Sequence, residues 1–329
     1  MTDTTSGRPR RILVTGVGGA PGLDVARRLL ALGCEVIAAD SDPDAIGLRL
    51  PDVTARVTVP ARDAGYASST LRLSAQLRPD AVVSAVEQEL PHLFGLRSDL
   101  AGLGVTLWLP DLPAIAACTD KARFARVLCD HHIPTPRTVG PDQLDAAPDG
   151  PLVVKPRRGQ GSKDVIHCRT RAQATVLCEL VPDPIVQEQV EGREFTADCL
   201  IDREGCASVI LRLRLVVKGG LAMVTETFHD AEVEQQVRAV LAATGLVGAC
   251  CVQGFLCEGG PHRVVIIEAN ARFGGGFPAA EAAGADLVGQ YLNGLTGHPV
   301  DHDRLRYRPG VRLTKSYETL AVTEGIAPR

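Results

Sequence analysis

The sequence predicts a doubly wound parallel α/β domain followed by α+β modules with antiparallel sheets. In the first part, apolar runs of strand length alternate with a helical pattern, as in a chain of βαβ units. From Pro151 onward, short strands and hairpin-like turns dominate, and helices recur only singly. A proline-punctuated passage, 110–113, separates the two patterns. We therefore expect two domains, residues 1–112 and 113–329.

The elements of the first domain follow from this apolar pattern. A polar leader over 1–9 precedes a strand at 11–15, a glycine-rich turn at 16–22 and a helix at 23–32. Gly33 then caps that helix, and an apolar run predicts a strand at 35–40. The alternation continues with a helix near 68–78 and strands near 56–59, 80–86 and 103–108.

The second domain begins with a helix that carries Cys118-Thr119-Asp120-Lys121, and a proline-rich connector follows at 133–136. Apolar runs predict strands over 185–190, 194–201, 247–255 and 264–268. Isolated helices are expected near 170–180, 230–244 and 278–292. We expect the segment after about residue 300 to complete a sheet or to fold back on the core.

Composition restricts the class of function. The 329 residues are 45% hydrophobic and 22% charged, as in an ordinary soluble globular protein. A net charge of -4 and an aromatic content of 4% argue against a nucleic-acid partner or an anionic membrane. The ten cysteines form no Cys-x-x-Cys pair, and the chain has no apolar run of signal or membrane-span length. We therefore expect free thiols in the cytoplasm.

The first glycine loop, Gly16–Gly22, invites a dinucleotide interpretation. It follows a predicted strand, and Asp40 ends the next strand, where a ribose-binding acid would sit. However, Gly22 stands one position late for the fingerprint, and Pro21 occupies the place of the expected glycine or alanine. The loop is also typical of α/β domains that use it only to pack the first helix. An NAD-dependent oxidoreductase remains an alternative.

A second loop has the chemistry of a phosphate cradle. Lys155 ends an apolar strand, where a charge is costly to desolvate without an anionic partner. Gly159, Gly161 and Ser162 follow and offer backbone and hydroxyl donors. The spacing is not that of a Walker A loop, and a basic surface hairpin is the alternative interpretation.

The most informative segment is the apolar run 264–267 with its polar continuation. Glu268, Asn270 and Arg272 alternate, so their side chains share one side of the strand. Two oxygen ligands beside a guanidinium suit a hard cation and the phosphate that it carries. Gln253 lies in another apolar strand, and pairing of the two strands would bring its amide to the same cation. The alternative is a strand end with a flexible polar turn.

In this order the motifs resemble those of the ATP-grasp superfamily, and they look closest to one half of the carbamoyl phosphate synthetase large subunit. The resemblance runs from residue 11 to about 300 and includes Gln187-Glu188-Gln189-Val190-Glu191-Gly192-x-Glu194. It implies a Rossmann-like pre-ATP-grasp domain, followed by a two-part ATP-grasp module with a lid subdomain at about 135–190. The cofactors implied are ATP and Mg²⁺, with Mn²⁺ as a substitute.

The resemblance also implies roles for single residues. Lys121 and Lys155 would contact the ATP phosphates under a lid formed by Gly159, Gly161 and Ser162. The adenine would contact the backbone at Glu188 and Val190, and the ribose would contact the Glu194 side chain. The metal ion would be bound by Gln253, Glu268 and Asn270. Arg272 would contact the transferred phosphoryl group. Among the alternating basic residues of 211–218, Arg214 and Lys218 are candidates to meet the substrate carboxylate, although solvated arginines on a half-exposed strand are an equal alternative.

The activity implied is ADP-forming ligation of a small carboxylate to an amine through an acyl phosphate, with an amino acid or small peptide as the default substrate and a homodimer as the assembly. Two departures from the family pattern bear on this prediction: Asp164 stands in the lid, and the first metal position is Gln253 rather than Glu. A second synthetase half and a glutaminase region are absent from the sequence, which argues against carbamoyl phosphate synthesis. A non-catalytic ATP-binding protein of the same fold remains an alternative.

Overall fold

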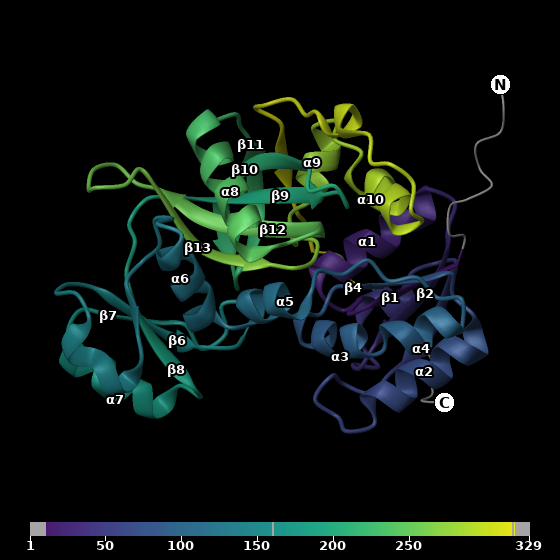
Figure 1. The fold of residues 1–329 in the computed structure, drawn as a ribbon, viewed down its shortest axis with the longest axis horizontal. Coiled ribbons are helices and arrows are strands. Elements are labelled where there is room, and N and C mark those ends of the chain that lie inside the picture. Colours follow the sequence, from purple (N-terminus) through teal and green to yellow (C-terminus); the bar gives the residue numbers. More distant parts are fainter. Residues whose placement is uncertain (1–10, 160, 318, 320–329) are drawn as a thin grey trace.

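The computed structural model describes residues 11–159, 161–317 and 319. The predicted leader at 1–9 lies outside these residues. Three sheets organise the described chain, one parallel and two antiparallel, as the sequence predicts (Figure 1).

The N-terminal sheet is parallel and has the strand order β3-β2-β1-β4. Its strands are β1 (Arg11–Thr15), β2 (Glu35–Asp40), β3 (Val53–Val57) and β4 (Ala81–Ser84). Successive residues point to opposite faces, so Ile12 and Val14 pack into one apolar cluster and Leu13 into another. Helices α1 (Ala20–Ala31) and α10 (Leu287–Leu295) cover the first face, whereas α2 (Tyr66–Leu77), α3 (Leu90–Gly95) and α4 (Arg97–Gly102) cover the second (Figure 1).

Two predictions for this domain need correction. The strand expected near 56–59 begins earlier, at Val53. The strand expected near 103–108 is absent from the described chain, where only Thr106 forms an isolated parallel bridge to Ala81. The chain leaves the sheet edge there because Trp108 is buried against Tyr291 of α10, with stacked rings 5.2 Å apart.

A small antiparallel sheet with the order β5-β8-β6-β7 follows in sequence. It consists of β5 (Thr138–Val139), β6 (Leu152–Pro156), β7 (Ile166–Cys168) and β8 (Pro184–Glu188), and α7 (Arg171–Leu180) packs on it. Helices α5 (Leu112–Thr119) and α6 (Lys121–Asp130) connect it to the parallel sheet (Figure 1).

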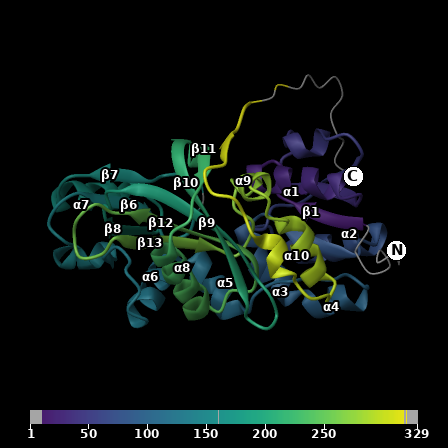
Figure 2. The same ribbon diagram turned by 90° about the horizontal axis from the view of Figure 1, so that it is seen from above.

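The third sheet has six strands in the order β13-β12-β9-β10-β11-β14. Its strands are β9 (Arg193–Ile201), β10 (Ala207–Lys218), β11 (Leu221–Thr227), β12 (Gly248–Leu256), β13 (Val264–Asn270) and β14 (Arg312–Thr314). Helix α8 (Ala231–Thr244) packs its apolar side on this sheet (Figure 2). Because β14 pairs with β11, the C-terminal segment completes the sheet, one of the two outcomes expected.

The helix expected at 278–292 is instead two helices, α9 (Pro278–Ala282) and α10. Gly284 separates them with a φ of 111°, a conformation that ends a right-handed helix. All ten cysteines lie within the described chain and are free thiols, as predicted. Over the same residues, no helix is both long and apolar enough to cross a membrane.

Candidate active site

A row of polar side chains crosses the six-stranded sheet. Gln253 on β12 lies opposite Glu268 on β13, as predicted, and also opposite Thr196 on β9. Thr196 in turn lies opposite Arg212 on β10. Residues directly opposite one another in antiparallel strands project from the same face. The row Glu268–Gln253–Thr196–Arg212 therefore shares one face of the sheet.

This face borders a cavity of about 1240 Å³ into which all three parts of the chain reach. The parallel sheet contributes the loop after β1, including Gly16 and Gly18, and the segment after β2. The small sheet contributes Lys155, and the loop that follows it contributes Gly159, Gly161 and Ser162. Of the predicted site residues, the lining contains Lys121, Lys155, Gly159, Gly161, Ser162, Glu194, Arg214, Gln253, Glu268, Asn270 and Arg272.

The predicted metal ligands form a connected group at one end of the row. Asn270 Nδ2 donates to Glu268 Oε1 at 3.3 Å, and Arg272 Nη2 donates to Asn270 Oδ1 at 3.0 Å. Gln253 faces Glu268 across the strand pair. One carboxylate and two amide oxygens are hard donors of the kind that Mg²⁺ takes, so the donor set fits this metal.

Lys155 is a buried cation on the opposite wall, with 8% of its surface exposed. Its Nζ donates to Gln187 Oε1 at 2.7 Å, and Gln187 Nε2 donates to Thr138 Oγ1 at 2.8 Å. Burial lowers the pKa of Lys155 to about 8, and the charge of Glu268 only partly offsets this effect. An anion in the cavity would stabilise the protonated form.

Lys121 at the start of α6 holds the loop after β6. Its Nζ donates to the Gly159 carbonyl at 2.7 Å, and its backbone N–H donates to the Arg157 carbonyl at 3.0 Å. The loop itself bends through left-handed conformations at Gly161, Ser162 and Asp164. Asp164, the departure from the family pattern, does not line the cavity.

Glu87 is a buried acid that the sequence analysis missed; it does not line the cavity, but it lies close enough to Arg272 and Glu268 for their charges to act on it. It lies in the short 3-10 turn after β4 and is 7% exposed. Burial raises its pKa to about 7, Arg272 opposes this shift, and Glu268 adds to it. Within the described residues, its Oε1 has no hydrogen-bond partner. The one available signal was its position directly after a buried strand, at the carboxyl edge of the parallel sheet.

The basic segment of β10 is placed differently from the prediction. Lys218 is exposed at the end of the strand and is not a lining residue, whereas Gly219 and Gly220, which follow it, line the cavity. Arg214 lines the cavity, but it forms an ion pair with Glu194 at 3.0 Å and donates to the Gly220 carbonyl at 2.9 Å. Arg212, which was not selected, is the buried basic residue of the segment.

Glu188 and Val190 also lie outside the cavity lining. The Glu188 carboxylate is exposed and accepts a long hydrogen bond of 3.4 Å from the Arg137 backbone N–H. Their predicted contact with a nucleotide therefore remains a prediction.

The loop after β1 is held by the residue that a dinucleotide would need. Asp40 Oδ2 accepts from the Gly18 N–H at 2.7 Å, and Oδ1 accepts from the Asp42 N–H at 3.0 Å. Gly22 allows α1 to approach the loop, since a Cβ there would lie 2.2 Å from the Gly16 carbonyl oxygen. The hydrogen bonds to Asp40 and the close approach at Gly22 both explain the glycines of the loop by the packing of α1, without a bound dinucleotide.

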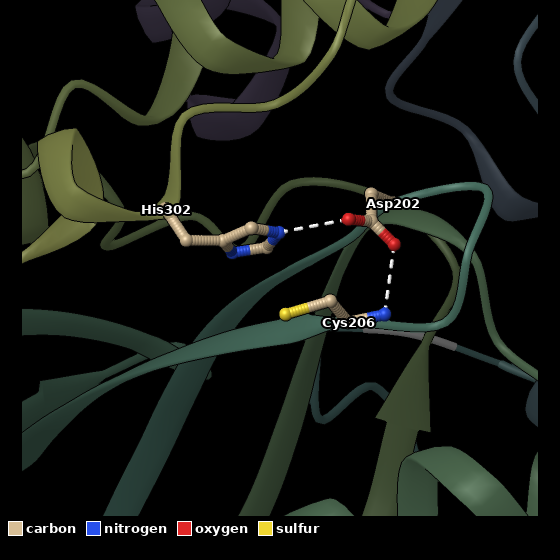
Figure 3. Close-up of side chains that lie close together, drawn as sticks. All are labelled: Asp202, Cys206 and His302. Atoms are coloured by element: carbon tan, nitrogen blue, oxygen red, sulfur yellow. Dashed lines mark hydrogen bonds and ion pairs between the residues drawn. The ribbon is translucent and has the colours of Figure 1, made fainter.

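A separate cluster of Asp202, Cys206 and His302 lies outside this cavity (Figure 3). His302 Nε2 meets Asp202 Oδ2 at 3.0 Å, and its Nδ1 meets Ser208 Oγ at 2.8 Å. Asp202 Oδ1 also accepts from the Cys206 backbone N–H at 2.7 Å. These contacts tie the segment after α10 to the turn between β9 and β10.

Comparisons with known proteins show what this chain is similar to. Residues 118–276 match the family model described as "ATP-grasp domain". The fold resembles that of an L-amino acid ligase from Bacillus licheniformis, with a TM-score of 0.72 and 18% identity over 92% of this chain and 78% of the other. No curated protein sequence matches the chain.

Two further solved structures share this fold. One is an N5-carboxyaminoimidazole synthetase from Staphylococcus aureus complexed with ADP, with a TM-score of 0.72 and 14% identity over 89% of this chain and 78% of the other. The other is a biotin carboxylase from Campylobacter jejuni, with a TM-score of 0.70 and 15% identity over 91% of this chain and 73% of the other. Residues 118–276 therefore match the ATP-grasp domain model, and the chain shares the fold of these three solved structures.

Proposed function

We propose that the protein is an ATP-dependent, ADP-forming ligase that joins a small carboxylic acid to an amine. One observation carries the proposal: the buried cation Lys155 lines the same cavity as the oxygen-donor group of Glu268, Gln253 and Asn270, and the charge of Glu268 acts on it. Cations on one wall suit phosphate oxygens, and the hard donors on the other suit a phosphate-bound divalent ion.

Different residues of the cavity wall bind different parts of ATP. Lys155 and Lys121 pair with its phosphates, and the loop with Gly159, Gly161 and Ser162 covers them. Glu194 accepts from the ribose hydroxyls and is itself oriented by Arg214. Glu268, Gln253 and Asn270 hold Mg²⁺, or Mn²⁺ in its place, which neutralises phosphate charge when bound. Glu188 and Val190 are proposed to contact adenine through their backbone.

The reaction proceeds in two steps. An oxygen of the substrate carboxylate attacks the γ-phosphorus of ATP, the bond to the β-phosphate oxygen breaks, and an acyl phosphate and ADP form. The amine then attacks the acyl carbon, phosphate leaves with its oxygen, and the nitrogen loses a proton. Arg272 lies next to the metal ligands and donates to the transferred phosphoryl oxygens, which lowers the barrier of the first step.

Two alternatives have weaker support. A nicotinamide-dependent oxidoreductase needs Asp40 for the ribose, yet both Asp40 oxygens already accept from backbone N–H groups. A non-catalytic ATP-binding protein was favoured by Asp164 in the lid, yet Asp164 does not line the cavity. We propose an amino acid or small peptide as substrate, the cytoplasm as the compartment, and a homodimer as the assembly.

The test is release of ADP and phosphate from Mg-ATP with a panel of amino acids and small acids, mixed pairwise with amines. We expect turnover that requires one acid–amine pair and disappears in Glu268→Ala. NAD reduction with no ATP turnover would support the oxidoreductase instead. Tight Mg-ATP binding without stimulation by any pair would support the non-catalytic protein.

A further inference from the structure

Asp202, Cys206 and His302 are three metal-ligating side chains that none of the roles proposed above uses. A carboxylate oxygen, the thiol sulfur and an imidazole nitrogen from these residues all lie within 4.8 Å of one another (Figure 3). None of the three lines the large cavity, so the cluster is separate from the proposed nucleotide site. Because His302 lies 100 positions after Asp202, the spacing of residues in the sequence does not reveal the cluster.

The tight turn between β9 and β10 carries two of the three ligands. Asp202 Oδ1 accepts from the backbone N–H groups of Glu204 and Cys206 at 3.0 and 2.7 Å. The Asp202 N–H donates to the Cys206 carbonyl at 2.9 Å, and Gly205 allows the turn with a φ of 85°. These contacts use Oδ1 and leave Oδ2 directed at His302. The backbone of the turn therefore orients the carboxylate and places the thiol beside it.

His302 supplies the third ligand from the segment after α10. Its Nε2 lies 3.0 Å from Asp202 Oδ2, close to the separation of about 3.3 Å between two ligand atoms of a tetrahedral zinc ion. Its Nδ1 lies 2.8 Å from Ser208 Oγ. A metal-bound histidine normally donates a hydrogen bond from its other ring nitrogen, and Ser208 offers the acceptor for that bond. The cluster thus has a supporting contact as well as its ligands.

The surroundings of Asp202 also favour a cation. Its side chain is 12% exposed, and within the described residues it forms no ion pair with a lysine or arginine. Its partner His302 carries a charge only when it is protonated. A carboxylate that is largely removed from water is costly unless it is paired or coordinates a metal. Cys206 is exposed, so a metal ion can enter from solvent.

We propose that Asp202 Oδ2, Cys206 Sγ and His302 Nε2 bind a Zn²⁺ ion, with water as the fourth ligand. Zinc takes oxygen, sulfur and nitrogen donors of these types in proteins, whereas Mg²⁺ prefers oxygen alone. On binding, the Cys206 thiol loses its proton to solvent, and the ion replaces the hydrogen bond between Asp202 and His302. The ion links the β9–β10 turn to the segment after α10. This site does not depend on the proposed ligase function.

The test titrates the metal-free protein with Co²⁺ and then with Zn²⁺, in excess Mg²⁺ so that sites built of oxygen ligands are occupied. We expect a single Co²⁺ ion per chain, with the visible absorption of a tetrahedral ion and a thiolate charge-transfer band, and displacement of that ion by Zn²⁺. Cys206→Ser should lose the thiolate band. Cys206→Ser and His302→Ala should each weaken Zn²⁺ binding by about tenfold or more. Cys129→Ser and His298→Ala replace exposed residues elsewhere and should leave binding unchanged.

Hydrogen exchange then locates the ion. Zn²⁺ should slow exchange at 202–206 and 302–305 in the wild type but not in Cys206→Ser. Because that variant changes only an exposed thiol, its urea midpoint without metal should equal that of the wild type. No stoichiometric Zn²⁺ binding, Co²⁺ binding without a thiolate band, or equal Zn²⁺ binding by the wild type and Cys206→Ser would overturn the inference. The cluster would then be a hydrogen-bonded contact only. None of these readouts requires ATP turnover, so they are separate from the test of the ligase.

Discussion

At the scale of single residues, Lys155 is the group whose environment most directly requires an anionic ligand. Its ammonium is buried, and within the described residues it donates one hydrogen bond, to the neutral amide of Gln187. A phosphate in the cavity would supply the missing negative charge. The residue follows a hydrophobic strand, so its burial could be predicted from sequence, whereas its bond to Gln187 depends on the pairing of β6 with β8.

We predict that Lys155→Met weakens Mg-ADP binding by about 10- to 100-fold, because a charge-assisted contact is lost. In the wild type, affinity should also fall as the pH rises above about 8, where the free protein loses the Lys155 proton. Lys155→Met should lack that additional fall. Calorimetry between pH 7 and 9.5 measures both effects.

The control is Arg72→Met, since Arg72 is an exposed cation of α2 outside the cavity lining. It should leave the affinity and its pH dependence unchanged. If both variants weaken binding equally, Lys155 has no special role.

The raised pKa of Glu87 predicts that the free energy of unfolding depends on pH. Its folded pKa is raised to about 7 by burial, so between the ordinary value of 4.5 and about 7 the folded state binds more protons than the unfolded state. The free energy of unfolding should therefore fall as pH rises through this window. Glu87→Gln should remove this contribution and be more stable than wild type at pH 8 by about 3 kcal/mol.

Urea unfolding of the wild type and Glu87→Gln at pH 4.5 and pH 8 measures this difference directly. Arg272, Glu268 and Lys121 are present in both proteins, so the difference between the curves reports mainly on the Glu87 carboxyl group. A constant difference across the pH range would show that the pKa of Glu87 is the same in the folded and unfolded protein, which contradicts the prediction.

At the scale of secondary structure, Asp120 connects two elements that carry the site. It caps α6 by accepting from the Arg123 N–H at 3.1 Å, and it accepts from Arg157 Nε at 2.8 Å. Burial acts to raise its pKa, but the hydrogen bonds from Arg157 and from the Arg123 backbone hold that pKa below its usual value. Asp120 therefore joins the start of α6, and with it Lys121, to the loop after β6.

We predict that Asp120→Ala destabilises the protein by about 1–3 kcal/mol, since the helix cap and the arginine contacts are both lost. Asp120→Asn keeps a capping oxygen and should lose less. Thermal and urea unfolding compare the two variants, and a larger loss for Asn than for Ala would contradict the capping role.

The elements themselves were predictable to different degrees. Strands with continuous apolar runs, such as β1, β2 and β13, were predicted close to their actual bounds. Buried strands of this kind have an uninterrupted apolar sequence that is clear without the structure. The predicted strand at 103–108 failed because the burial of Trp108 against α10 is a long-range contact. The predicted helix at 278–292 failed because the break depends on the conformation of Gly284.

At the scale of the whole molecule, residues from the parts of the chain that carry the three sheets together line the cavity, and no single part contains it. The motif residues could be predicted to share a site because their residue types and spacing are those of a phosphate and metal site. Arg212 and Glu87 could not, since each is an ordinary charged residue in sequence. Their importance follows from burial beside a partner that is distant along the chain.

The central claim is that this cavity activates a carboxylate by phosphorylation. The most direct measurement uses the acid identified by the substrate panel, labelled with ¹⁸O in its carboxylate, and analyses the released phosphate by mass spectrometry. We predict one ¹⁸O atom in the phosphate for each product molecule, with ADP as the nucleotide product. Unlabelled phosphate, or label in AMP, would contradict the account.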